Sequence, residues 1–168
     1  MIEFRPLRTD DLPLLRDWLA RQHVRRWWRD SIEESLTEYE QAIVGVDPTD
    51  DYLILREDRP IGMIETYLVS DHPEWEAIVQ VGEGVAGLDL LIGDPELTGR
   101  GLGPRILATF AEQVVFASSG TRACVAAVDE ENRRSWRAFE KAGFQYVRDV
   151  EEDGRPHRLM RLDRSYPP

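Results

Sequence analysis

A short glycine-rich segment is the first place where this sequence could bind an anionic ligand. The segment Thr98–Gly103 reads Thr-Gly-Arg-Gly-Leu-Gly and lies between an expected strand and an expected helix. Glycines let a backbone approach a ligand closely, and the N–H groups at the start of a helix point toward an anion. The segment is not a Rossmann fingerprint, because the x-x-Gly and the later acid are missing, nor a Walker A loop, because no Gly-Lys-Ser/Thr follows. Arg100 and Arg105 add positive charge, so we expect a phosphate-binding turn; the alternative is a tight turn without a ligand.

A carboxylate inside an apolar strand is the second candidate for chemistry. Asp89 interrupts the apolar run Gly87–Ile92, and a charge among apolar neighbours is costly unless it is paired. A carboxylate at this position could hold an ammonium group and take its proton, which would free the amine to attack a carbonyl carbon. The alternative is an aspartate that faces solvent at the edge of the strand.

The charge distribution favours a cationic ligand. The 168 residues include 21 Lys plus Arg and 32 Asp plus Glu, which gives a formal net charge of −11. No Lys or Arg occurs from Pro60 to Gly99, a stretch that contains Glu65, Glu83 and Asp89 among its acidic residues. Such a surface attracts polycations and disfavours nucleic acid and anionic membranes as partners. The alternative is a solvated acidic loop.

The elements that would position these residues follow the order β-α-α-β-β-β-α-β-α-β-β along a single expected domain, residues 1–168. We expect strands at 2–6, 51–56, 60–69, 85–92, 122–128, 146–151 and 157–164. We expect helices at 10–20, from Ser31 to near Gly45, at 104–117 and at 132–141, with a polar loop between 69 and 85. Ser31 and Glu34 have the spacing of a capping box, and Asp153-Gly154 is typical of a hairpin turn. The pattern predicts an α/β fold, a mixed sheet with helices on its faces.

Other features exclude several classes of protein. The single cysteine, Cys124, cannot form an intramolecular disulfide and lies in an apolar run expected to be a buried strand. The N-terminal residues lack the apolar core of a signal peptide, and no segment is apolar enough to span a membrane. His23, His72 and His157 are too scattered to suggest a metal site. We therefore expect a cytoplasmic enzyme or binding protein that holds no metal.

A second motif follows the glycine-rich segment. It reads Asn132-x-x-Ser135-x-x-x-Phe139 and continues Glu-Lys-Ala-Gly-Phe to Phe144. Together with Arg100–Gly103, this motif resembles the GNAT superfamily of N-acetyltransferases, and the order of elements extends the resemblance over nearly the whole chain. The resemblance implies a mixed, mostly antiparallel twisted sheet of about six or seven strands flanked by about four helices, with acetyl-CoA as co-substrate. The cofactor-binding residues it implies are Leu90, Leu91, Ile92, Arg100, Gly101, Leu102, Gly103, Pro104, Arg105, Asn132 and Phe139.

One position departs from the superfamily pattern in a way that matters for chemistry. Phe139 stands where many members carry a tyrosine that protonates the leaving thiolate, and phenylalanine has no proton to donate. Tyr146 is the candidate replacement. Alternatively the thiolate leaves unassisted, since a thiol with a pKa of about 8.5 is a tolerable leaving group near neutral pH.

A closer resemblance is to aminoglycoside 6′-N-acetyltransferases. It rests on Asp11-Leu12-x-x-Leu15-x-x-Trp18-Leu19, His23-Val24-x-x-Trp27-Trp28, Pro60-Ile61-Gly62, Thr66-Tyr67 and Gly87-Leu88-Asp89-x-Leu91. The resemblance implies that Asp89 contacts the aminoglycoside and serves as the base, and that Trp28 and Tyr67 line the sugar pocket. Two further acidic positions of the family are not matched directly by an acid in this sequence. At the first, this sequence has Gly82, with Glu83 adjacent, and the second lies near Asp129. Trp75, inside the acidic stretch, is a further candidate for the pocket, since tryptophan rings cover sugars and attract cations.

These expectations combine into direct transfer of an acetyl group to the 6′-amine of an aminoglycoside. Asp89 would deprotonate the amine, and a backbone N–H near Leu90 would polarise the thioester carbonyl. One alternative is acyl transfer to another amine, namely a polyamine, a siderophore lysine or a protein N-terminus. The other is a non-catalytic acyl-CoA-binding protein, which Phe139 favours and Asp89 disfavours. We expect a monomer or a homodimer, with neither nucleic acid nor membrane as a partner.

Overall fold

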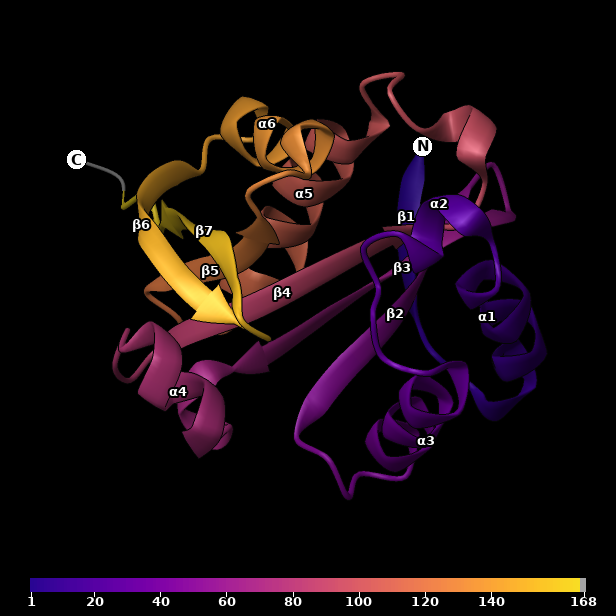
Figure 1. Ribbon diagram of the computed structural model, residues 1–168, viewed down its shortest axis with the longest axis horizontal. Helices are drawn as coiled ribbons and strands as arrows, with labels where there is room; N and C mark the ends of the chain where they lie inside the picture. The colour runs from indigo at the N-terminus through magenta and orange to yellow at the C-terminus, as the bar shows by residue number, and fades with distance from the viewer. Residues whose placement is uncertain (167–168) are drawn as a thin grey trace. The chain divides into compact units, whose positions relative to one another are not determined.

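The computed structural model describes residues 1–166, which form both strands and helices (Figure 1). The strands are β1 (Ile2–Pro6), β2 (Thr49–Arg56), β3 (Arg59–Leu68), β4 (Val85–Ile92), β5 (Ala123–Asp129), β6 (Gln145–Glu152) and β7 (Arg155–Asp163). The helices are α1 (Leu12–Leu19), α2 (Gln22–Arg25), α3 (Ile32–Ile43), α4 (Pro73–Val79), α5 (Leu102–Gln113) and α6 (Arg133–Lys141). The seven strands form a sheet of order β1-β2-β3-β4-β5-β7-β6. Pairing is antiparallel for β1–β2, β5–β7 and β6–β7 and parallel for β4–β5, so the predicted mixed α/β class is confirmed.

The chain divides into two compact units, each built from two segments of sequence. The first unit contains Met1–Thr66 and Asp89–Thr98, and the second contains Tyr67–Leu88 and the chain from Gly99 onward. Strands β3 and β4 each contribute residues to both units. The prediction of one domain over residues 1–168 stays a prediction.

The core of the first unit lies between α1, α3 and the strands. Helix α3 contacts α1 and β2, and the buried cluster joins Trp18 of α1 and Leu36 of α3 to Leu53, Met63 and Leu91 of β2, β3 and β4. Side chains along a strand point alternately to the two faces of the sheet, so residues two positions apart lie on the same face. The face of β2, β3 and β4 that carries Leu53, Met63 and Leu91 is therefore the face that α1 and α3 cover.

Two glycines in the first unit are required by close approaches of other groups. A Cβ atom at Gly62 would lie 2.2 Å from the carbonyl oxygen of Leu91, and one at Gly93 would lie 2.2 Å from the Trp18 ring. Neither distance leaves room for a methyl group. These glycines therefore keep the backbone of β3 close to β4 and the end of β4 close to α1.

Helix α3 begins with the capping box that the sequence predicts. The Ser31 hydroxyl accepts a hydrogen bond from the Glu34 N–H at 3.1 Å, and the Glu34 carboxylate accepts one from the Ser31 N–H at 3.0 Å. Replacing Ser31 by alanine removes the first bond, so we expect a loss of about 1 kcal/mol in the free energy of unfolding measured with urea. Ser31→Thr is the control, because threonine can make the same bond. Equal stability of all three proteins would contradict this account of the helix start.

The second unit packs α5 and α6 with β5, β6 and β7. Its apolar core includes Val85 of β4, Val125 of β5 and Leu159 of β7. The β6–β7 hairpin turns at Asp153 and Gly154, whose φ angles of 51° and 72° suit the two central positions of a type I′ turn. Cys124 is buried in β5, and burial raises the pKa of its thiol to about 12. This cysteine therefore stays protonated, as the prediction of an inert core residue requires.

The structure differs from the expected elements mainly in short helices. Helix α4 lies where a polar loop was expected, and α2 was not predicted. A helix of seven residues such as α4 spans only two turns and buries one residue, Val79, so its apolar periodicity is too short to detect. Helix α5 begins at Leu102 and ends at Gln113, because Val115–Ala117 forms a 3₁₀ turn. Among residues 1–166, no helix is long and apolar enough to cross a membrane.

Candidate functional site

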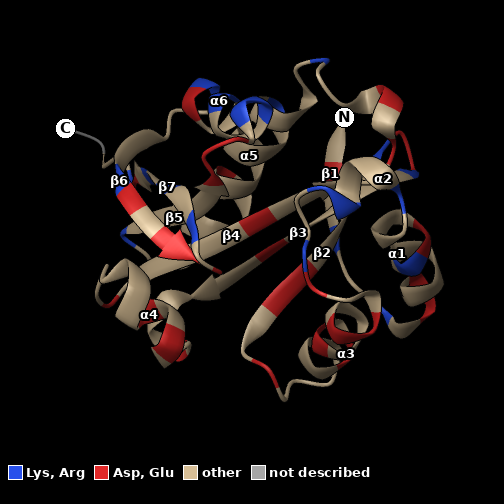
Figure 2. Cartoon of the chain, viewed as in Figure 1, with Lys and Arg blue, Asp and Glu red and all other residues tan. Residues whose placement is uncertain are grey.

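Three acidic side chains of the first unit come from three neighbouring strands. Asp51 lies on β2, Glu65 on β3 and Asp89 on β4, and Figure 2 shows acidic segments on these strands. Each is two residues from a core residue of its strand, namely Leu53, Met63 and Leu91. Strand alternation therefore places the three carboxyl groups on the face covered by α1 and α3, where they continue the apolar core as a polar cluster. We call Asp51, Glu65 and Asp89 the carboxyl cluster.

Glu65 occupies the middle of the carboxyl cluster. Its side chain hydrogen-bonds to both Asp51 and Asp89. Burial raises the pKa of Glu65 well above its usual range, and the charges of Asp89 and Asp51 raise it further. A hydrogen bond between two carboxyl groups needs one of them to carry the proton. A proton shared within the cluster meets this requirement, and burial favours the protonated form of its central member, Glu65.

Asp51 is the most buried member of the cluster. Its side chain is 7% exposed, and neither of its carboxylate oxygens accepts a hydrogen bond from an N–H or hydroxyl group of residues 1–166. Burial, opposed by the Glu65 hydrogen bond, raises the pKa of Asp51 to about 6. The hydroxyl groups of Tyr39 and Ser35 on α3 are also buried and lack partners within the described residues. None of the contacts described above places a cation beside the carboxyl cluster.

The end of β4 is fixed by two side chains of the first unit. The His23 imidazole contacts the Ile92 carbonyl oxygen at 2.9 Å, and the Arg21 guanidinium donates to the Gly93 carbonyl oxygen at 2.7 Å. The pairing of β4 with β5 covers only Val85–Gly87, so it uses no backbone group of Leu90, Leu91 or Ile92. Trp28 is half-buried against the core of this unit.

In the second unit, the glycine-rich segment forms the start of α5. Gly99 and Gly101 have φ angles of 72° and 77°, which favour glycine over other residues. No side chain caps the helix N-terminus at Gly101, and Pro104 lies in the first turn, where a missing N–H costs no helical bond. The free N–H groups of this 12-residue helix, with Arg100 and Arg105 nearby in sequence, suit a phosphate group. The predicted phosphate-binding turn therefore has the backbone it needs.

The second motif lies at the start of α6 and along its buried side. The Asn132 side chain caps α6 by accepting a hydrogen bond from the Ser135 N–H at 3.3 Å, which leaves its amide nitrogen to donate to a ligand. Phe139 is buried and packs edge-to-face on Phe144 with ring centroids 5.0 Å apart. The sequence predicted a cofactor role for both Asn132 and Phe139, and this role stays a prediction.

Tyr146, the candidate proton donor, makes a different contact. Its side chain is exposed, and its hydroxyl donates to the Asp149 carboxylate at 3.0 Å. This hydrogen bond raises the pKa of Tyr146 above its usual value. The proton is therefore held toward Asp149, and a role in protonating a thiolate stays a prediction.

The aromatic candidates of the second unit share one apolar cluster. Tyr67 and Trp75 both pack, half-buried, against the core residues Val69, Val79 and Val85. The Tyr67 ring meets the His72 ring edge-on at 4.9 Å and lies so close to Gly87 that a Cβ atom there would be 2.4 Å from it. Glu83 is exposed in the loop after α4. The structure thus brings Tyr67 and Trp75 together.

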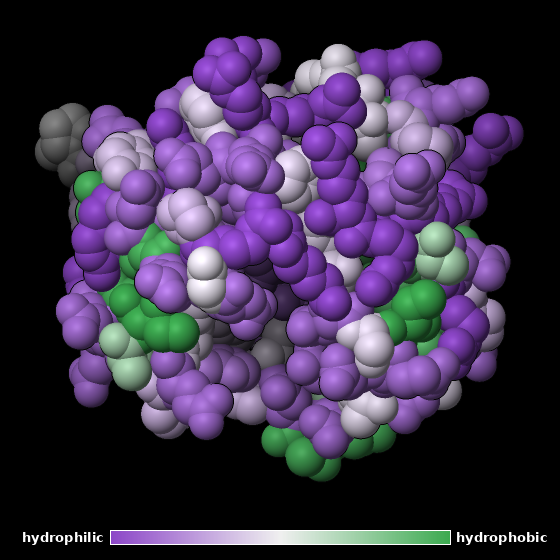
Figure 3. Space-filling view, viewed as in Figure 1, coloured by the Kyte–Doolittle hydropathy of each residue, from purple (hydrophilic) through white to green (hydrophobic). Residues whose placement is uncertain are grey.

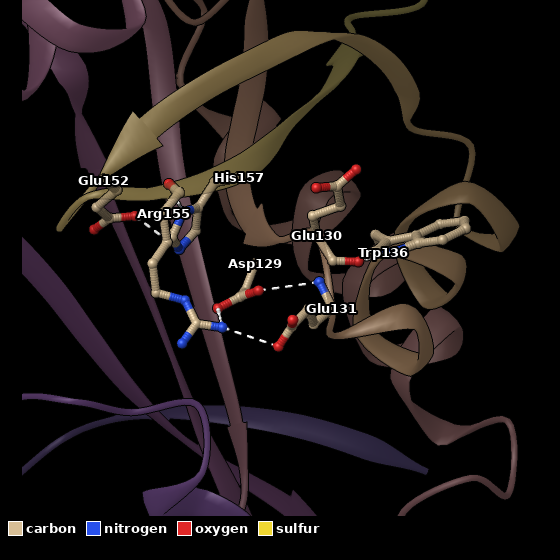
Figure 4. A network of polar contacts seen from close by, with 7 residues as sticks. All are labelled: Asp129, Glu130, Glu131, Trp136, Glu152, Arg155 and His157. Carbon is tan, nitrogen blue, oxygen red and sulfur yellow. Dashed lines mark hydrogen bonds and ion pairs between the residues drawn. The ribbon is translucent and has the colours of Figure 1, made fainter.

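Asp129 is already engaged by neighbours in the second unit. Figure 4 shows its carboxylate at the end of β5, where it accepts from the Glu131 N–H at 3.0 Å and pairs with Arg155 at 3.2 Å. The same Arg155 nitrogen pairs with Glu131 at 3.0 Å. A cationic substrate would have to displace Arg155 or share Asp129 with it. Its role in substrate binding stays a prediction.

A comparison with protein families decides the class of this protein. Residues 8–152 match the family described as an acetyltransferase (GNAT) domain. The chain belongs to the GNAT acetyltransferase family. This confirms the resemblance that the motifs around Gly101 and Asn132 indicated.

This GNAT acetyltransferase is similar to known enzymes over most of its length. It is 26% identical over 151 residues to aminoglycoside N(6′)-acetyltransferase type 1 of Klebsiella pneumoniae, which covers 86% of this chain and 74% of the relative. Among solved structures, it superposes on aminoglycoside acetyltransferase AAC(6′)-Ib in complex with coenzyme A and kanamycin with a TM-score of 0.87. That match is 25% identical and covers 98% of this chain and 95% of the other. A spermidine N-acetyltransferase from Vibrio cholerae, 16% identical with a TM-score of 0.72 over 96% of this chain and 95% of its own, shares the fold.

Sequence reasoning singled out Asp89 in this GNAT acetyltransferase but not its neighbours in the carboxyl cluster, and the role of Asp89 stays a prediction. Glu65 was one of many acidic residues in a long acidic stretch, and Asp51 lay outside that stretch. One pattern could have identified Glu65 and Asp51: on each of three strands an acidic residue lies two positions from a core residue. This pattern becomes informative once the strand order is known. The Arg155–Asp129 pair was missed because it joins separate strands. Within residues 1–166, no group of three or more His, Cys, Asp or Glu side chains could hold a metal ion.

Proposed function

We propose that this GNAT acetyltransferase moves the acetyl group of acetyl-CoA to the 6′-amine of an aminoglycoside. The observation that carries the proposal is the carboxyl cluster, which puts Asp89 beside two further acids and so suits a polycationic amine. Similar proteins also support the proposal. A relative with 26% sequence identity to this chain carries the name aminoglycoside N(6′)-acetyltransferase, and a solved structure with 25% identity contains coenzyme A and kanamycin.

The proposed step is direct transfer without an enzyme-bound acetyl group. Asp89 holds the 6′-ammonium by charge and takes one proton from it, directly or through water. The lone pair of the freed amine attacks the thioester carbonyl carbon, and a backbone N–H near Leu90 donates to the carbonyl oxygen. The C–N bond forms, the C–S bond breaks and the nitrogen gives up its second proton to water, so the products are the neutral amide and coenzyme A. Tyr146 protonates the thiolate, or the thiolate takes its proton from solvent.

The residues for acetyl-CoA are those at the start of α5 and along β4. The N–H groups of Leu102 and Gly103, with Arg100 and Arg105, neutralise the pyrophosphate. The backbone of Leu90–Ile92, which takes no part in the β4–β5 ladder, pairs with the extended pantetheine arm. Acetyl-CoA supplies the activated acetyl group, and the protein supplies orientation and charge.

A valine at position 101 is expected to raise the KM for acetyl-CoA about tenfold with a smaller effect on kcat. Gly101 has a φ of 77°, which a β-branched residue adopts poorly, so the N–H groups that follow would turn away from the pyrophosphate. A tenfold change corresponds to about 1.4 kcal/mol, roughly one hydrogen bond to a charged group. Gly120→Val is the control, because a Cβ atom there meets nothing within 4 Å and its φ is ordinary. A KM that stays at the wild-type value in Gly101→Val would remove the turn from the acetyl-CoA site.

The second candidate function is acetylation of another polycationic amine. The same cluster of acids would attract a polyamine, and the fold is shared with a spermidine acetyltransferase. Trp28, Tyr67, Trp75 and Glu83 are the residues proposed to favour a sugar-bearing substrate, since aromatic rings cover sugar faces. Location in the cytoplasm and a monomeric or homodimeric state remain predictions.

Release of free thiol from acetyl-CoA over a panel of amines tests the proposed function. The panel contains kanamycin, tobramycin, an aminoglycoside without a 6′-amine, spermidine and a lysine peptide. We expect fast turnover of kanamycin and tobramycin only. Turnover of spermidine or the peptide alone would overturn the substrate but keep the acetyltransferase. No turnover together with tight acetyl-CoA binding would favour a non-catalytic binding protein.

A further inference from the structure

The carboxyl cluster has a property that a simple acidic patch lacks: its members hydrogen-bond to one another. Glu65 contacts Asp51 on one side and Asp89 on the other. Two ionised carboxylates repel each other, whereas a protonated carboxyl donates one strong hydrogen bond to a carboxylate. The contacts therefore require a proton within the cluster, and the one on Glu65 can be donated to Asp51 or to Asp89, but not fully to both.

Burial explains why the cluster keeps this proton. The Asp51 side chain is 7% exposed, and its two oxygens have no donor among the N–H and hydroxyl groups of residues 1–166. Tyr39 of α3 is 3% exposed, and its hydroxyl likewise lacks a partner among those residues. With so little solvent and no donor at Asp51 from outside the carboxyl cluster, a fully ionised cluster is costly.

The other charged groups around the cluster act in the same direction. Asp47, which precedes β2, Asp50 of β2 and Glu38 of α3 add negative charge near Asp51. The charges of Asp51 and Asp89 act on Glu65, and the charges of Glu65, Asp51, Glu38 and Asp89 raise the pKa of the Tyr39 hydroxyl. Each of these carboxylates favours the protonated form of its neighbours, and the pKa of Glu38 is itself raised by burial and by Asp30, Asp47 and Glu34.

We propose that Asp51 and Glu65 are positioning residues for the transfer reaction, in which Glu65, on the strand between those of Asp51 and Asp89, carries the proton of the carboxyl cluster and presents it to Asp89 while Asp51 keeps that proton on Glu65. This inference rests on the proposed function of Asp89 as the base. Glu65 as donor stabilises the carboxylate form of Asp89 and orients one of its oxygens. When the pH rises and Glu65 loses its proton to solvent, the cluster gains one negative charge and binds a polycationic amine more tightly.

The two residues make opposite predictions under conservative substitution. Glu65→Gln keeps a donor toward Asp89 and cannot ionise, so it copies the protonated form at every pH. Asp51→Asn removes the negative charge that holds the proton on Glu65, so Glu65 should ionise at a lower pH. Asp50→Asn is the matched control, because Asp50 is the adjacent residue of β2, is exposed and acts on Asp51 only through its charge, so the variant measures the loss of one nearby charge without the loss of a cluster member.

The direct test follows the Glu65 carboxyl by ¹³C NMR in protein labelled at glutamate side chains, with Glu65→Gln assigning its signal. We expect a titration midpoint well above the ordinary value of about 4.3 in the wild type and in Asp50→Asn. In Asp51→Asn we expect the midpoint to fall by about one to three pH units. An ordinary midpoint in the wild type, or the same midpoint in Asp51→Asn, would overturn the proposal. This readout does not depend on turnover, so it remains decisive if the proposed function fails.

The second test is the KM for kanamycin as a function of pH. The amines of kanamycin titrate too, and Glu65→Gln shows the change in KM that they cause by themselves. In the wild type we expect KM to fall further than in this variant as Glu65 ionises. In Asp51→Asn the same transition should occur at lower pH. Identical profiles for the wild type and Glu65→Gln would contradict the coupling to Asp89. If Asp51→Asn does not fold, the comparison of the wild type with Glu65→Gln still decides the matter.

Discussion

Replacing Asp89 by asparagine is expected to lower kcat/KM for kanamycin at least about 100-fold while acetyl-CoA binding stays within about threefold of the wild type. General base catalysis contributes roughly 100-fold to 10,000-fold, and the amide of asparagine cannot take a proton from an ammonium group. Asparagine has nearly the shape of aspartate and can still hydrogen-bond to Glu65. The loss therefore reports the missing charge and base rather than a disturbed core.

The matched control for this variant is Asp71→Asn, which removes one exposed negative charge from the same acidic stretch. Its kcat/KM should stay close to that of the wild type, because a single exposed charge is screened by salt. Steady-state kinetics with kanamycin and isothermal titration with acetyl-CoA check both variants. An Asp89→Asn enzyme with wild-type kcat/KM would exclude Asp89 as the base and would return attention to water or to Glu65.

The second large effect is expected in stability. Asp51→Asn should be more stable than the wild type by about 3 kcal/mol at pH 7.5 and nearly equal to it at pH 4. In the folded wild type the pKa of Asp51 is raised from 3.8 to about 6, chiefly by burial. At pH 7.5 the folded protein must therefore hold a buried charge that the unfolded chain exposes to water. Asparagine carries no charge, and its amide can donate to Glu65.

The sign of the pH dependence follows from the direction of this shift. A carboxyl group whose pKa is higher in the folded than in the unfolded state favours folding below pH 3.8, and this contribution is lost as the pH rises through about 6. The difference in unfolding free energy between the variant and the wild type should therefore grow from pH 4 to pH 7. Urea unfolding at several pH values measures it, with Asp50→Asn as the exposed control. A difference that is constant with pH would show that Asp51 does not titrate in this range.

Elements with strong local signals were predictable from the sequence. Strands 2–6 and 85–92 were predicted with the same bounds as β1 and β4, because each is a run of strand-forming residues bounded by turn residues. The start of α3 was predicted from Ser31 and Glu34, whose side chains complete a local capping box. The backbone of the glycine-rich turn was predictable for the same reason, since the glycines at 99 and 101 carry their conformational preference wherever they stand.

The arrangement of the carboxyl cluster could not be predicted from the sequence. It depends on the order of β2, β3 and β4 and on their register, and a shift of one residue would move a carboxyl group to the other face of the sheet. Asp51 lies 14 residues before Glu65 and 38 before Asp89 in the chain, so no local pattern links them. The engagement of Asp129 by Arg155 depends in the same way on the β5–β7 pairing.

The surface adds little that would identify a further partner. Figure 3 shows a mostly hydrophilic face on which apolar residues gather only in small separate groups. Exposed large apolar side chains such as Val44, Val46 and Ile78 belong to helix ends and loops, and scattered apolar residues of this kind are normal on a protein surface. The acidic charge of the strands in Figure 2 is the feature on which the proposed cationic substrate rests.

The central claim is tested most directly by the position of the acetyl group on the product. Kanamycin is incubated with the protein and acetyl-CoA carrying a ¹³C-labelled acetyl group, and the product is analysed by two-dimensional NMR. The account predicts one labelled amide, on the 6′-nitrogen, formed in step with the release of free thiol. A label on another nitrogen, or unmodified kanamycin beside intact acetyl-CoA, would contradict it.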